Sequence, residues 1–180
     1  MPKVLIPLAQ GCEELEAVTI IDLLRRANIT VITAGLDIKP VIASRGVVLI
    51  PDTTLDEALN QEFDMVVLPG GLPGSNHLNN DSRIQNLLKK MQKQNKYTAA
   101  ICAAPKVLAS AGLLDGKSVT SYPGALEITS AINFIDQPVV KDGLVITSRG
   151  PGTAMDFTLE LIEILVGSEI RNKVETGLVR

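Results

Sequence analysis

Histidine, tryptophan and clustered basic residues are what this 180-residue sequence has least of. It contains one histidine, His77, so any Cys-His pair would have to use that residue. Tryptophan is absent and aromatic residues make up only 3% of the chain, which predicts a core of aliphatic side chains. The net charge is −3 and no group of Lys and Arg alternates with aromatic residues, so nucleic-acid binding is not expected.

Cysteine is scarce as well. Two cysteines, Cys12 and Cys102, are too few for the disulfide framework of a small secreted domain, and with His77 they lack the spacing of zinc ligands. No phosphate-binding loop or G-x-G-x-x-G pattern follows the first expected strand, so we expect neither a metal nor a cofactor. No apolar run could cross a membrane, and the N-terminus enters a strand pattern without a signal peptide, which predicts a cytoplasmic protein with no membrane partner.

Strand patterns alternate with helix patterns along the whole chain. This alternation predicts one α/β domain over residues 1–180, with a mostly parallel sheet covered by helices on both faces. Strands are expected at 3–8, 29–34, 64–69, 98–101 and 118–122, hairpins at 41–50 and 139–147, and helices at 13–27, 54–60, 82–94, from 105, at 125–131 and at 153–166.

The sequence is organised around the stretch from Tyr97 to Lys106. A short apolar strand ends at Cys102, and Pro105 suits the first turn of a helix that begins almost at once. Small residues such as Ala103 permit a sharp corner, as in a nucleophile elbow. At that corner we expect a strained backbone and a thiol pKa lowered by the helix N-terminus. The alternative is that Cys102 is an ordinary buried cysteine.

Four unusual segments follow expected strands, at residues 11–16, 70–75, 102–105 and 148–152. Function gathers at the carboxyl ends of the strands in such a sheet, so these segments are expected to meet. Gly70 and Gly71 are suited to direct a backbone N–H, together with that of Ala103, at a reacting centre, although a tight turn would also use them.

Glu16 is the first candidate for acid–base chemistry. It lies within the apolar arc of the expected helix 13–27, where a carboxyl must be paired or protonated, and we expect its pKa to be raised. Glu13 and Glu14 are interpreted as charges that suit the helix N-terminus. Cys12 is interpreted as a packing residue, and structural or solvated roles are expected for Arg45 and Arg149.

Taken together, the motifs resemble one protein family over essentially the whole chain. They are Gly11-x-Glu13-Glu14-x-Glu16, Leu68-Pro69-Gly70-Gly71, Ala100-Ile101-Cys102-Ala103-x-Pro105 and Thr147-Ser148-Arg149-Gly150-Pro151-Gly152-Thr153. The sequence resembles the ThiJ/PfpI superfamily, and within it the branch of the parkinsonism-associated deglycases and their bacterial YajL-like relatives. The resemblance implies a flavodoxin-like sandwich related to class I glutamine amidotransferases, and a homodimer. It implies that Cys102 is the reactive cysteine, that Glu16 is a protonated carboxyl beside it, and that Gly71 and Ala103 supply backbone donors.

One departure from the family pattern bears on the chemistry, and a second is Cys12 in place of a small residue before the two glutamates. Many members have a histidine where this chain has Tyr122, and a tyrosine hydroxyl is a poor base at neutral pH. Tyr122, Arg149 and Pro151 are therefore expected only as accessory residues. Two functions stay open: attack of Cys102 on a small dicarbonyl in a glyoxalase III-like or deglycase reaction, or oxidation of Cys102 to a sulfinate in a redox sensor or chaperone. Members of the family also carry labels of thiazole monophosphate biosynthesis and proteolysis, but the sequence has no phosphate loop and no Cys-His pair that would support them.

Overall fold

The computed structural model describes residues 1–180 and contains a seven-stranded sheet with helices on both faces. Its strand order is β10-β11-β7-β6-β1-β2-β5, and only the edge strand β10 is antiparallel to its neighbour. The five central strands follow the doubly wound order of flavodoxin, which confirms the predicted α/β fold. The strands are β1 (Lys3–Leu8), β2 (Thr30–Gly35), β5 (Thr53–Thr54), β6 (Met65–Leu68), β7 (Tyr97–Ile101), β10 (Val139–Asp142) and β11 (Val145–Ser148).

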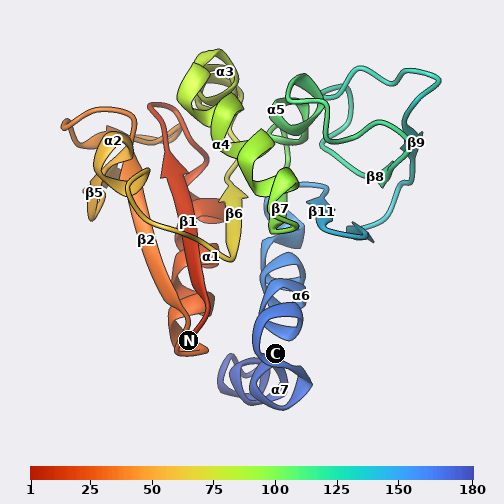
Figure 1. Cartoon of the computed structure of the whole chain (residues 1–180). Helices are drawn as coiled ribbons and strands as arrows, with labels where there is room; N and C mark the ends of the chain where they lie inside the picture. Colours follow the sequence, from red (N-terminus) through yellow and green to blue (C-terminus); the bar gives the residue numbers. More distant parts are fainter.

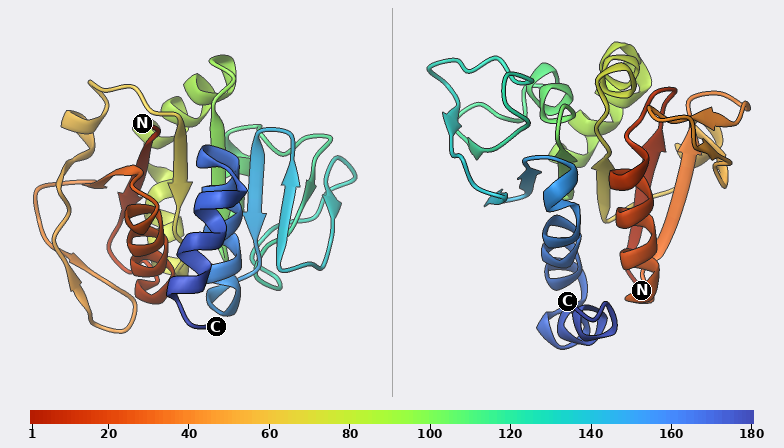
Figure 2. Two further views of the ribbon diagram at one scale, coloured as in Figure 1. Left: turned by 90° about the horizontal axis from the view of Figure 1, so that it is seen from below. Right: turned by 180° about the vertical axis from the view of Figure 1, so that it is seen from behind.

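Helices form the two outer layers (Figures 1 and 2). Helices α1 (Glu14–Arg26) and α6 (Ala154–Val166) pack on one face, and α7 (Ser168–Gly177) follows α6. The other face carries α2 (Leu55–Ala58), α3 (Leu72–Asn80), α4 (Ser82–Lys93) and α5 (Pro105–Ser110). Two small sheets lie outside the main one. They are the hairpin of β3 (Val41–Ile42) and β4 (Val48–Leu49), and the parallel pair of β8 (Ser118–Val119) and β9 (Asn133–Phe134).

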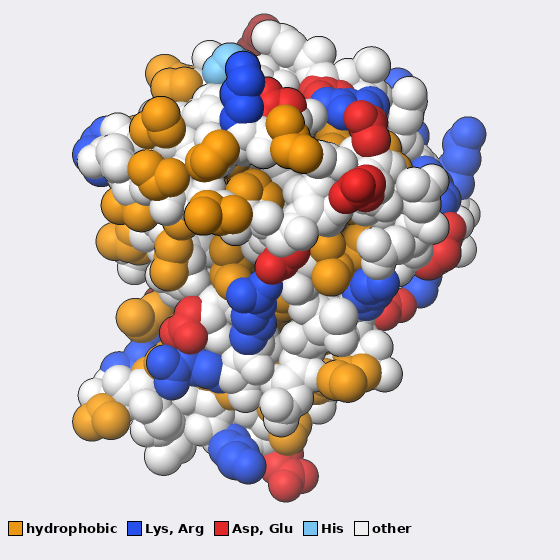
Figure 3. All heavy atoms as spheres, turned by 90° about the vertical axis from the view of Figure 1, so that its left-hand side faces the viewer, with side chains coloured by type: hydrophobic (Ala, Val, Ile, Leu, Met, Phe, Trp, Pro, Cys, Tyr) orange, Lys and Arg blue, Asp and Glu red, His pale blue; other side chains and the backbone are white.

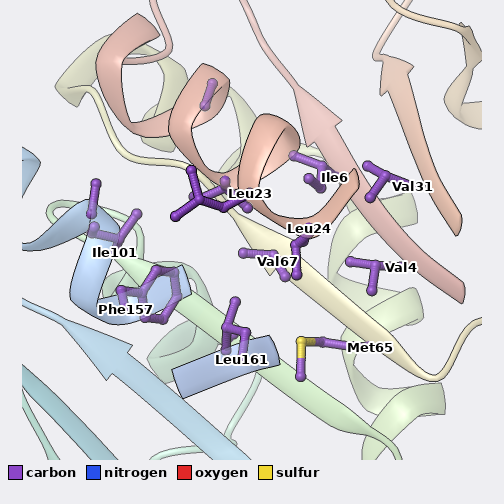
Figure 4. Close-up of a cluster of buried hydrophobic side chains, with 14 of the residues drawn as sticks. Val4, Ile6, Leu23, Leu24, Val31, Met65, Val67, Ile101, Phe157 and Leu161 are labelled. Carbon is purple, nitrogen blue, oxygen red and sulfur yellow. The ribbon is translucent and has the colours of Figure 1, made fainter. Parts of the chain in front are cut away.

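The core is aliphatic, as predicted. Figure 4 shows Val4, Ile6 and Val67 of the sheet near Leu24 of α1, and Phe157 of α6 beside Ile101 of β7. Alternate residues of the same strands point into a second cluster under the helices of the opposite face. Burial of strand residues on both faces explains why the central strands are continuous apolar runs.

Several segments differ from the prediction: the short strands β5 and β9 were not predicted, and the strand expected at 118–122 ends at Val119. The helix expected at 125–131 is wrong, because residues 123–125 and 130–131 form turns and residues 127–129 have no regular structure; Gly124 has a φ of 76°. Helix α3 was not predicted; it begins directly after Gly71 and has Pro73 in its first turn. Helix α7 was not predicted; it begins after Gly167, whose φ of 90° ends α6.

No helix has the length and apolar character needed to cross a membrane; the longest, α1 and α6, have 13 residues each.

Candidate active site

The corner after β7 has the geometry of a nucleophile elbow. Cys102 has a φ of 63°, in the left-handed region that side chains other than glycine rarely occupy, so the predicted backbone strain is confirmed. Its N–H donates to Ser148 O over 2.9 Å, and its carbonyl oxygen accepts from Tyr122 N over 2.8 Å. The backbone is therefore held from both sides in a conformation that places the thiol at the carboxyl edge of the sheet.

Gly70 allows three segments to meet. A Cβ at this position would lie 2.6 Å from Cβ of Cys102 and 2.6 Å from Oε2 of Glu16. No side chain fits between those atoms, so the end of β6, the elbow and α1 converge here only because residue 70 is glycine. Gly71, with a φ of 88°, then begins α3.

Glu16 is completely buried on α1 beside the elbow. Its Oε2 accepts a hydrogen bond of 2.8 Å from Gly70 N, whereas its Oε1 has no hydrogen-bond partner in the protein. Its own N–H donates to the side chain of Glu13, which caps the helix. A buried carboxyl oxygen without a donor favours the protonated form, because a proton removes the uncompensated charge.

Burial raises the pKa of Glu16 to about 7, although the Gly70 N–H and the Cys102 thiol pull it down in part. The raised value was predicted from the position of Glu16 on the helix. This pKa places ionisation of Glu16 near neutrality, where a carboxyl group serves as both acid and base.

The predicted lowering of the Cys102 pKa is wrong. Burial, followed by the charge of Glu16, raises it to about 12, and the N–H groups of Gly71 and Ala103 offset this only in part. Cys102 is only 8% exposed, so desolvation outweighs the N–H groups at the start of the helix. Each anion opposes the other, so the pair carries a single negative charge above neutral pH and titrates as a unit.

A cavity of about 470 Å³ opens above the thiol. Its walls come from residues 44–45, the start of α3 at 71–73, the turn at 122–125, and Pro151. Arg45 places a positive charge on the cavity wall. Glu13, the residue before α1, also lines the cavity. The site thus joins segments that are far apart in the sequence, at the strand ends where they were expected to meet.

Of the remaining residues considered in the sequence, some line the Cys102 cavity and the others lie outside it. Tyr122 and Pro151 line the Cys102 cavity, whereas Arg149 lies in a neighbouring one and pairs with Asp136 over 2.9 Å. His77 is exposed on α3 and does not line the cavity, so it forms no part of this site. Cys12 is buried, its pKa is raised to about 12 chiefly by burial, and it packs in the core as predicted.

Glu14 is a structural residue that sequence reasoning missed. It was interpreted as a helix-end charge, but it is buried and accepts hydrogen bonds from Ser44 Oγ (2.8 Å) and Arg45 N (2.7 Å). Burial acts to raise its pKa, but its own backbone N–H together with the donors of Ser44, Arg45 and Val47 outweighs burial and lowers the pKa. Glu14 therefore fixes the loop that carries one wall of the cavity. Nothing in the sequence signals this contact with a loop thirty residues away.

No group of three or more His, Cys, Asp or Glu side chains is arranged to bind a metal ion.

Comparison with known proteins matches residues 2–164 to the DJ-1/PfpI family. Protein dj-1beta of Drosophila melanogaster is 46% identical over 97% of this chain and 95% of its own length, and its crystal structure matches with a TM-score of 0.95, covering 99% and 97% of the two chains. The structure titled "Toxoplasma gondii DJ-1, oxidized" is 37% identical, with a TM-score of 0.95 and coverage of 99% and 98%. A Caenorhabditis elegans relative named glutathione-independent glyoxalase DJR-1.2 is 35% identical over 95% of this chain and 91% of its own length. The chain belongs to the DJ-1/PfpI family.

Proposed function

We propose that this protein is a cofactor-independent enzyme that converts small reactive dicarbonyls, such as methylglyoxal, to hydroxy acids. The observation that carries the proposal is the buried Glu16 carboxyl, whose Oε1 has no partner and whose pKa is about 7, beside the strained Cys102. The name of the C. elegans relative supports the same activity.

The reaction balances without an outside oxidant or reductant. Sulfur of Cys102 attacks the aldehyde carbon, and the thiol proton passes through Glu16 to the carbonyl oxygen, which gives a hemithioacetal. Glu16 then removes the proton on that carbon and the adjacent ketone carbon is protonated, so the hemithioacetal isomerises to a thioester of lactate. Water cleaves the thioester, releasing lactate and the thiol. The N–H groups of Gly71 and Ala103, which favour negative charge near the sulfur, would stabilise the oxyanions.

Replacing Cys102 with serine should abolish lactate formation. A serine hydroxyl is a far weaker nucleophile than a thiol and has no base other than Glu16, so we expect a loss of at least about a thousandfold. The measurement is lactate released from methylglyoxal by the purified wild type and by Cys102→Ser, with Cys12→Ser as the matched control for the other thiol. Wild-type activity in Cys102→Ser would refute the assignment.

A second function is favoured by the same donors. Peroxide can oxidise Cys102 to a sulfinate, with Glu16 taking up the thiol proton, two peroxide molecules consumed and two water molecules released. Glu16, then protonated, and the N–H groups of Gly71 and Ala103 would hold the added oxygens, and a relative's structure is described as oxidized. Absence of lactate from the wild type, with peroxide adding the mass of two oxygen atoms at Cys102, would favour this sensor function over turnover.

We also propose that the protein is a homodimer through its N-terminal apolar surface. This surface comprises exposed side chains of α1 and of the hairpin, namely Leu15, Val18, Ile42, Val47 and Val48. Figure 3 shows hydrophobic side chains gathered below the single histidine, on the side of the molecule that carries α1. The hairpin that presents three of these residues also carries the cavity wall at 44–45, so the interface would border the site.

Leu15→Glu should shift the protein toward monomer at micromolar concentration, because it places a charge within the apolar interface. Ile128→Glu is the matched control, since Ile128 is 51% exposed compared with 52% for Leu15 but lies in the 123–131 segment. Sedimentation of the wild type and of both variants measures whether each protein is a monomer or a dimer. A monomeric wild type would contradict the proposed dimer.

A further inference from the structure

Tyr122 stands between two cavities. The Cys102 cavity, of about 470 Å³, adjoins a second of about 420 Å³ that contains Arg149 and Asp136. Tyr122, Pro123 and Pro151 line both. The tyrosine and the two prolines therefore form the wall that the two cavities share.

The backbone of Tyr122 is fixed relative to the nucleophile. Its N–H donates to the carbonyl oxygen of Cys102, and its own carbonyl oxygen accepts from Ala125 N over 3.0 Å, which closes the turn. The position of the ring consequently depends on its side-chain torsions rather than on movement of the loop.

Gly150 sets where the ring can lie. A Cβ at this residue would be 3.3 Å from Cδ2 of Tyr122, closer than ordinary van der Waals contact. The φ of Gly150 is 170°, an extended value open to any residue, so glycine is needed here for the ring and not for the backbone. The tyrosine side chain is 51% exposed, which leaves its other face free for substrate.

We propose that Tyr122 is a specificity-determining residue that limits the carbonyl compound at Cys102 to a short one. Its ring is part of the wall that the Cys102 cavity shares with the cavity of Arg149, so a substituent that extends from the reacting carbonyl toward Arg149 meets the ring. Without the ring the two cavities would join, and an aryl-substituted dicarbonyl would extend across them. The substrate class rests on the function proposed above, whereas the restriction on size concerns access to the thiol alone.

The first test compares substrates of two sizes. The ratio of kcat/KM for phenylglyoxal to that for methylglyoxal should rise roughly tenfold in Tyr122→Ala, since steric exclusion by a pocket wall is worth about this much. Tyr122→Phe keeps the ring and removes only the hydroxyl, so its ratio should match the wild type. An unchanged ratio in Tyr122→Ala, or an equal rise in both variants, would overturn the proposal.

The second test does not depend on turnover. Alkylation of Cys102 by iodoacetamide and by N-phenylmaleimide, followed by peptide mass, reports access for a small and a bulky reagent. The bulky-to-small rate ratio should rise roughly tenfold in Tyr122→Ala and stay at the wild-type value in Tyr122→Phe. This result in a protein that forms no lactate would refute the glyoxalase function and support the role of Tyr122. An unchanged ratio in Tyr122→Ala would refute that role whatever the enzyme's activity.

Discussion

Replacing Glu16 with glutamine should stabilise the protein by about 3 kcal/mol above pH 7, even though it removes the proposed acid and base. The pKa of Glu16 is about 7 in the folded protein because of its burial, compared with about 4.5 for an ordinary glutamate. The folded state therefore holds a proton that the unfolded state releases between these two values. Stability of the wild type falls as pH rises through this interval, and the full deficit is present above pH 7.

Glutamine avoids this loss because it stays neutral. Its carbonyl oxygen can still accept the hydrogen bond from Gly70 N, and its amide group takes the place of the hydroxyl of protonated Glu16. The measurement is the free energy of unfolding of wild type and Glu16→Gln by denaturant at pH 5 and pH 8. The difference in unfolding free energy between Glu16→Gln and the wild type should grow from pH 5 to pH 8. Glu127→Gln, at an exposed residue, should show no such growth. A difference that does not depend on pH would mean that Glu16 is already ionised at pH 5.

Gly71→Ala should be among the most destabilising single-methyl changes in the chain, on the order of 3 kcal/mol. At a φ of 88° an alanine is strained, and its Cβ would lie 2.6 Å from Glu13 N and 2.8 Å from the carbonyl carbon of Cys12. Both contacts are with backbone, which cannot rotate away as a side-chain end would. The contact between α1 and the start of α3 would have to open, and with it the cavity that contains Cys102.

Gly112→Ala separates the two causes. Gly112 has a similar φ of 77°, but nothing lies within 4 Å of a Cβ there. Gly112→Ala should lower the free energy of unfolding only by the cost of a left-handed backbone for alanine, about 1 kcal/mol. It should leave the alkylation rate of Cys102 unchanged. Denaturant unfolding of both variants gives the comparison. Equal losses of stability in Gly71→Ala and Gly112→Ala would show that the close contacts at residue 71 relax without an energetic cost.

The parts of the site that sequence reasoning predicted depend on short-range chemistry. The elbow at Cys102 follows from a strand, a turn of small residues and Pro105 within one decapeptide. The burial of Glu16 follows from the spacing of apolar residues on one helix. Both predictions need only the local spacing of apolar residues and the steric requirements of a sharp strand-to-helix turn.

The parts that sequence reasoning missed depend on distant partners. The pKa of the Cys102 thiol is decided by the depth of the pocket and by Glu16, so a helix-end argument alone gave the wrong direction. Glu14 acts on Ser44 and Arg45, which lie on a separate hairpin. The segment 125–131 has helix-forming residues but no apolar stripe that packs on the sheet, and it is mostly exposed. Tertiary contacts therefore determine the pKa of Cys102, the role of Glu14 and the structure of the 125–131 segment.

The peptide group of Cys102 joins two segments, because its N–H bonds to the end of β11 and its oxygen to Tyr122. Strand β7 is an interior strand with β6 and β11 on either side, so the elbow cannot open by fraying from an edge. We therefore expect the reactive corner to belong to the same cooperative unit as the sheet, so that its amides exchange with solvent when the sheet itself separates. On heating, activity and fold should therefore be lost together, and the strained conformation at Cys102 persists for as long as the native sheet does.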